Sequence, residues 1–97
     1  MKDLINKLDK LLENRVRLGI MSALMVNDSV DFNTLKELLG VTDGNLASHL
    51  KALEKGGLVK IHKQFIGRKP NTKYNASDKG KKVFNEHLGA LEQLIRR

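Results

Sequence analysis

Leucines recur at helical spacing between Thr42 and Gly56, where Leu46, Leu50 and Leu53 fall on one side of a predicted helix. The other side of this helix carries small and polar residues and no carboxylate beyond the first turn. Thr42 is placed to cap the first turn through its hydroxyl, and Gly56 supplies a glycine where helices commonly end. We therefore expect a helix that buries its leucines and presents its polar side to a partner.

Four further segments repeat apolar residues at the period of an α-helix. Asn33 and Ser77 are candidate N-caps for the last two of them. The second segment is apolar on all sides, which is typical of a central helix covered by several neighbours. The predicted helices span about residues 3–13, 15–26, 34–39 and 78–96.

Residues 58–66 alternate between apolar and polar positions, with Ile61 and Phe65 on the same face, as in a half-buried strand. Residues 67–71 form a predicted turn that contains two cations and a proline, and residues 72–76 can return as a second strand. This hairpin directly follows two short helices joined by a glycine-containing turn. The order is that of a helix-turn-helix followed by a wing.

The predicted fold is therefore mainly α with a small β-hairpin (α+β), a winged helix-turn-helix in a single domain over residues 1–97. The helix-turn-helix is expected at about 33–57 and the wing at about 58–76. The terminal helices, about 3–13 and 78–96, carry more apolar surface than so short a chain can cover, so we expect them to form a homodimer interface. The predicted interface residues are Leu4, Ile5, Leu8, Leu11, Leu12, Phe84, His87, Leu88, Leu91, Leu94 and Ile95.

The net charge of +7 is unevenly distributed. Residues 1–57 contain eight Lys or Arg and eight Asp or Glu, whereas residues 58–97 contain ten Lys or Arg and three Asp or Glu. A one-sided basic field attracts polyanions such as nucleic acid. The alternative is an ordinary solvated basic surface.

The sequence offers few groups for other chemistry. It has no Cys, and its three His lie on different predicted elements without neighbouring ligands, so we expect neither a metal site nor a cofactor. We find no nucleophile–base pair or carboxylate dyad and expect no enzymatic activity. The N-terminal segment is interrupted by charges, which indicates neither a signal peptide nor a membrane span and favours a cytoplasmic protein.

Residues 41–54 resemble the recognition segment, and residues 65–74 the wing, of small winged-helix regulators of the MarR/ArsR-like superfamily. The resemblance implies sequence-specific binding of double-stranded DNA by a homodimer that regulates transcription, and repression by occluding a promoter is the expected mode. The chain departs from the family at Ala76 and Ser77, where Leu-Thr is common, and it lacks the cysteines of metal-sensing members. MarR-like relatives often bind a small-molecule effector, but nothing in this sequence specifies one.

The candidate DNA contacts form two groups. Asn45, Ser48 and Lys51 have side chains that can bond base edges in a major groove, and Gly44 would allow a close approach. On the wing, Arg68 is suited to the phosphate backbone or the minor groove. The full predicted sets are Thr42, Asp43, Gly44, Asn45, Ser48, His49 and Lys51 on the helix, and Arg68, Lys69, Asn71, Thr72 and Lys73 on the wing.

Two alternatives remain for this surface. The polar side of the helix and the basic wing are also what a solvated surface would show. A winged helix can serve as a protein–protein interaction module, in which case the basic half would bind an acidic partner and DNA binding would be weak and non-specific. Binding of RNA or single strands is disfavoured, because the four aromatic residues are too few for a stacking platform and most of them are expected to be buried.

Overall fold

The computed structural model describes residues 1–96. Within that range five α-helices, one 3-10 turn and a three-stranded sheet form an elongated molecule, 53 Å in its longest dimension. None of the helices in residues 1–96 has the length and apolar character needed to cross a membrane. In chain order the elements are α1 Lys2–Asn6, η1 Lys10–Leu12, α2 Arg15–Met25, β1 Val30–Asp31, α3 Phe32–Leu39, α4 Asp43–Lys55, β2 Val59–Ile66, β3 Lys69–Ala76 and α5 Asp78–Ile95.

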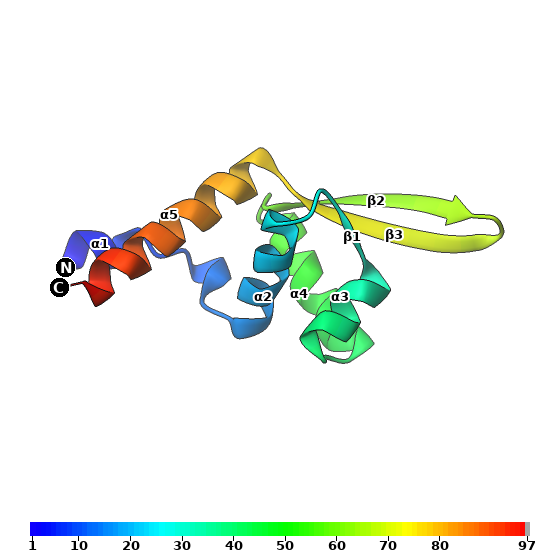
Figure 1. Ribbon diagram of the computed structural model, residues 1–97, viewed down its shortest axis with the longest axis horizontal. Coiled ribbons are helices and arrows are strands. Elements are labelled where there is room, and N and C mark those ends of the chain that lie inside the picture. Colours follow the sequence, from blue (N-terminus) through cyan, green and yellow to red (C-terminus); the bar gives the residue numbers. More distant parts are fainter. Residues whose placement is uncertain (97) are drawn as a thin grey trace.

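The predicted α+β class, mainly helical with a β-hairpin, is confirmed. One end of the molecule is helical, and the other is formed by the β-hairpin (Figure 1). Both chain termini lie at one end, where α1 runs beside the last turns of α5. The β2–β3 hairpin extends from the other end, beyond the helices. Helices α3 and α4, which form the helix-turn-helix, lie between these two ends and below the strands in this view.

The hydrophobic core surrounds α2. Leu46, Leu50 and Leu53 of α4 are buried, as their helical spacing predicts, and belong to one cluster with Ile20 and Leu24 of α2. Because α2 contacts α3, α4, α5 and β3, it needs apolar residues on several sides. Burying a leucine of this kind stabilises the fold by roughly 2 kcal/mol.

The sheet is antiparallel and has β3 in the centre, in the order β1-β3-β2. Val30 of β1 faces Tyr74 in the register, and Val59 of β2 faces Ala76. All four residues are buried, so the base of the hairpin lies over the helices. Burial, followed by the charge of Glu54, raises the pKa of the Tyr74 hydroxyl.

The prediction of one continuous helix over residues 3–13 is wrong. Helix α1 ends at Asn6, and a separate 3-10 turn, η1, begins after Asp9. The Asp9 carboxylate accepts the N–H of Leu11 at 2.8 Å, and the Asp9 N–H donates to Nδ1 of His87 at 3.0 Å. Both bonds draw Asp9 out of helical geometry, because one caps a new turn and the other ties the backbone to α5.

The prediction that Asn33 caps α3 is also wrong. Asp31 caps this helix instead of Asn33, and α3 therefore begins at Phe32. The Asp31 carboxylate accepts the N–H of Thr34 at 2.7 Å, and this hydrogen bond is the main cause of the lowered pKa of Asp31. The caps predicted at Thr42 and Ser77 are confirmed.

The hairpin is more regular than predicted. Its strands pair as far as Ile66 opposite Lys69, so the expected five-residue turn shrinks to Gly67 and Arg68. Gly67 has φ 64°, a left-handed conformation that glycine adopts without strain. Phe65 was expected on a buried face, but it is 74% exposed because the hairpin has passed beyond the helices.

Ser77 joins the wing to the body of the molecule. Its Oγ donates to the carbonyl of Gly57 at 2.6 Å and accepts the N–H of Gly80 at 2.9 Å. Its backbone N–H donates to the carbonyl of Leu58 at 2.9 Å. Helix α5 therefore begins in contact with the segment that leaves α4. A Cβ at Gly80 would collide with the Leu58 carbonyl oxygen, so this approach requires glycine.

We predict that Gly80→Ala lowers the free energy of unfolding by about 2 kcal/mol or more, because the added methyl group must displace backbone. Gly89→Ala is the matched control in the same helix, where a Cβ would meet nothing within 4 Å. It should raise the stability by about 0.5–1 kcal/mol, since alanine favours a helix over glycine. Urea denaturation measures both variants, and equal stabilities would contradict the close contact at Gly80.

Candidate nucleic-acid interface

Helix α4 buries one side and exposes the other. Gly40, with φ 63°, ends α3 in a left-handed conformation, and α4 begins after Thr42. Asn45, Ser48 and Lys51 are all exposed, on the side opposite the buried leucines. A Cβ at Gly44 would meet nothing within 4 Å, so the space beside the first turn is open. The structure thus brings the predicted polar contacts together on one accessible helix face.

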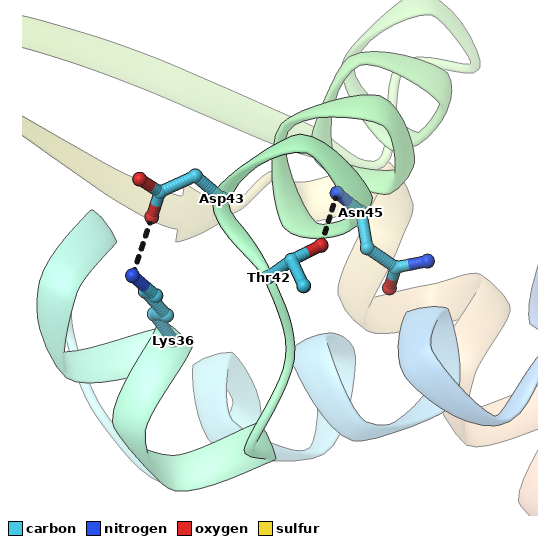
Figure 2. A network of polar contacts seen from close by, with 4 residues as sticks. All are labelled: Lys36, Thr42, Asp43 and Asn45. Carbon is cyan, nitrogen blue, oxygen red and sulfur yellow. Dashed lines mark hydrogen bonds and ion pairs between the residues drawn. The ribbon is translucent and has the colours of Figure 1, made fainter.

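Two of the predicted contact residues hold the helix-turn-helix together (Figure 2). The Thr42 hydroxyl accepts the N–H of Asn45 at 3.1 Å, and the Asp43 carboxylate pairs with the Lys36 ammonium of α3 at 2.9 Å. Figure 2 shows the side-chain amide of Asn45 pointing away from both contacts. Lys36 offsets the negative charge that Asp43 brings to this surface, and Asn45 stays exposed.

His49 is held by an arginine from another helix. The Arg17 guanidinium lies 3.2 Å from Nδ1 of His49, and its Nε donates to the carbonyl of Leu11 at 2.7 Å. Because a guanidinium can only donate, Nδ1 of His49 accepts and the neutral ring carries its proton on Nε2. Arg17 thereby ties α4 to the segment that precedes α2.

A recess of about 430 Å³ lies beside this pair. It is lined by Arg15 from the start of α2 and by Thr42, Asn45 and His49 from the start of α4. Arg15 and Arg17 were only weak candidates for this surface in the sequence, because they are distant from α4 along the chain. Packing of α2 on α4 brings them beside α4.

The predicted wing residues do not share one face. Arg68 lies in the turn, whereas Lys69, Asn71 and Lys73 alternate with Thr72 along β3. Side chains of alternate strand residues point to opposite faces, so Thr72 lies on the face of Tyr74 and the other three on the opposite face. The wing therefore presents cations at its tip and along one face.

The Lys and Arg side chains of the wing segment are not offset by any carboxylate within that segment. Between Lys55 and Ser77 the chain contains five Lys or Arg and no Asp or Glu. Most side chains of this segment beyond the base of the hairpin are exposed or half-buried. An extended basic ribbon beside an accessible polar helix face is the arrangement that polyanion binding requires.

The predicted interface residues of the terminal segments fall into two sets. Leu12, Phe84 and His87 are buried inside the chain, so they are not on the surface that a dimer contact needs. In the sequence alone, core residues and interface residues of a helix have the same apolar spacing and cannot be told apart. Ile5 and Ile95 are more than half exposed, at 52% and 82%. The exposed members are Ile5, Leu88, Leu91 and Ile95, and the half-buried ones are Leu4, Leu8, Leu11 and Leu94.

Comparison with known proteins bears on this surface. A family model described as a winged helix DNA-binding domain matches residues 16–95. An uncharacterized protein of Methanocaldococcus jannaschii is 36% identical over 85 residues, which cover 88% of this chain and 92% of that protein. The structure of a transcriptional regulator homologue from Pyrococcus horikoshii is 35% identical and superposes with a TM-score of 0.88 over 99% of this chain and 96% of that one.

More distant structures share the fold alone. A MarR-family transcriptional regulator from Silicibacter pomeroyi is 16% identical, with a TM-score of 0.71 over 95% of this chain and 61% of its own. The resemblance inferred from residues 41–54 and 65–74 is confirmed for a winged-helix regulator by the family match and by the Pyrococcus horikoshii homologue. The chain therefore belongs to the family of winged helix DNA-binding domains.

Proposed function

We propose that this chain binds specific double-stranded DNA as a homodimer and represses transcription by occluding a promoter. The observation that carries the proposal is the accessible polar face of α4 beside a wing without a carboxylate. The Pyrococcus horikoshii protein, described as a transcriptional regulator homologue, supports the regulatory role. A dimer with two-fold symmetry would read a nearly palindromic operator with half-sites about 10 bp apart.

The face of α4 supports base readout. Asn45 can bond adenine through two atoms, Ser48 can serve several bases, and Lys51 can take guanine or phosphate. All three side chains are exposed, so binding would not require them to leave the core. His49 presents an Nε2–H donor, since Arg17 engages its other ring nitrogen.

Exposed apolar residues support the dimer. Leu88, Leu91 and Ile95 recur on α5 at a helical spacing and are 44%, 36% and 82% exposed. Ile5 of the neighbouring α1 is 52% exposed. Clustered side chains of this kind at one end of a small domain are typical of a protein–protein interface. This end lies opposite the hairpin, so a partner there would leave the wing free (Figure 1).

No effector enters the proposal. NadR, solved in complex with 4-hydroxyphenylacetate, shares the fold with this chain at 21% identity. A likeness at that level does not extend to a ligand.

Replacing Arg68 by Ala should weaken binding to every duplex and lower the slope of log affinity against log salt by about 0.9, the value for one lost phosphate contact. Lys10→Ala, at an exposed cation of η1 outside the wing, should leave both quantities unchanged. Fluorescence anisotropy on a labelled duplex at several salt concentrations gives both. An unaltered slope in the Arg68 variant would remove the wing tip from the proposed interface.

Replacing Asn45 or Ser48 by Ala should change base preference, because each side chain is proposed to bond a base edge. The loss at the affected base pair should be about 1–3 kcal/mol for a bidentate contact. Selection of bound sequences from a random duplex pool measures it. Asn85→Ala, at an exposed asparagine of α5, is the control. Recovery of the parental consensus from both α4 variants would contradict base readout by these residues.

Replacing Leu88 by Glu should convert the dimer into single chains, since two carboxylates would be buried in the proposed interface. Leu38→Glu is the matched control, because Leu38 is 64% exposed on α3, outside the terminal helices. Analytical ultracentrifugation distinguishes the two states. A parent chain that sediments as a monomer, or a Leu88 variant that stays dimeric, would contradict this interface.

A further inference from the structure

We propose that Phe65, Ile66 and Pro70, which we call the apolar wing tip, pack against the deoxyribose walls of the minor groove while Arg68 enters it. This inference rests on the proposed function, since it assumes that the chain binds a DNA duplex. It adds a contact that is apolar and independent of base sequence to an interface otherwise built from charged and polar groups.

The first observation is exposure without a partner in the chain. Phe65 is 74% exposed and Ile66 is 61% exposed, although both occupy regular strand positions. The inward face of the hairpin is covered only near its base, at Val59 and Tyr74. By the strand register Phe65 continues that face outward, toward the end of the hairpin that extends beyond the helices (Figure 1). Phe65 is therefore not part of the hydrophobic core.

The second observation is the register at the tip. Phe65 faces Pro70 and Ile66 faces Lys69, with Gly67 and Arg68 forming the turn. Consecutive strand residues point to opposite faces, so Phe65 with Pro70 covers one face of the ribbon and Ile66 covers the other. The tip is thus a narrow element with apolar groups on both sides and a cation at its end.

The shape of this tip matches a minor groove. The groove is about 6 Å wide, too narrow for a two-stranded ribbon with its side chains but wide enough for one extended side chain. Arg68 at the turn can enter the groove. The residues immediately behind it would then meet the groove walls, which are formed by sugars with exposed C–H groups.

Charge selects this partner over an apolar protein surface. Lys63 and Lys69 flank Phe65 and Ile66, and no Asp or Glu occurs between Lys55 and Ser77. Asp31 of β1 lines a recess with Ile66, Lys69 and Pro70, where it lies near one of these cations. A second copy of the chain would bring the same cations against these and repel them. A DNA backbone presents phosphates, which can contact the cations of the tip, and apolar sugar surface, which can contact its apolar side chains. Exposed strand residues of this kind also favour aggregation, which a bound duplex would prevent.

The test separates apolar from ionic contacts. In Phe65→Thr and Ile66→Thr a β-branched residue keeps the strand, and Val26→Thr is the control at an apolar residue that is 82% exposed outside the wing. Fluorescence anisotropy with the selected operator and with an unrelated duplex gives affinity and salt slope. We expect each wing variant to bind both duplexes about tenfold more weakly with the parental salt slope, because apolar contacts release no counterions. The control should bind like the parent.

The outcomes distinguish this inference from the proposed function. A parent chain that binds no duplex overturns both. A parent that binds its operator while the two wing variants bind equally well overturns the apolar contact alone. A reduced salt slope, or a loss confined to the operator, also overturns it, since the contact would then be ionic or base-specific. Loss of dimerisation in the wing variants, measured by sedimentation, would assign the tip to a second copy instead.

Discussion

The junction at Ser77 is the constraint on which the two halves of the molecule depend. The Ser77 hydroxyl donates to the Gly57 carbonyl and accepts the N–H of Gly80. The backbone N–H of Ser77 donates to the carbonyl of Leu58. The Lys79 ammonium adds a bond to the Gly56 carbonyl at 3.1 Å. The end of α4, the start of β2, the end of β3 and the start of α5 therefore meet at one point. This junction therefore connects the position of α5 to that of the wing.

The division of α4 into a buried and an exposed side follows from the same packing. Leu46, Leu50 and Leu53 are essentially inaccessible to solvent, and they fix the rotation of the helix about its own axis. That rotation leaves Ser48 and Lys51 exposed on the opposite side. The hydrophobic core therefore orients the proposed contact surface. The pair of Lys36 and Asp43 adds a second link between α3 and α4.

The two ends of the molecule expose different kinds of surface. The end with both termini carries Leu88 and Ile95, exposed and apolar, whereas the hairpin carries a net positive charge with Phe65 near its tip. In a chain of 97 residues the core cannot cover every apolar side chain, because a small domain buries a smaller fraction of its surface than a large one. Most of the large apolar side chains that stay exposed lie at these two ends, while Val26 and Leu38 are exposed between them.

The sequence by itself determined α2, α4, α5, the hairpin and the caps at Thr42 and Ser77, because helical periodicity, strand alternation and capping are local properties of the chain. It could not decide which apolar residues of the terminal segments and of the hairpin are covered. His87 and Phe65 show both kinds of error: His87 is buried against the Asp9 backbone, and Phe65 is exposed beyond the helices. The contact of Arg17 with His49 could not be predicted from the sequence either. These features depend on which distant segments come together, and only the tertiary structure decided that.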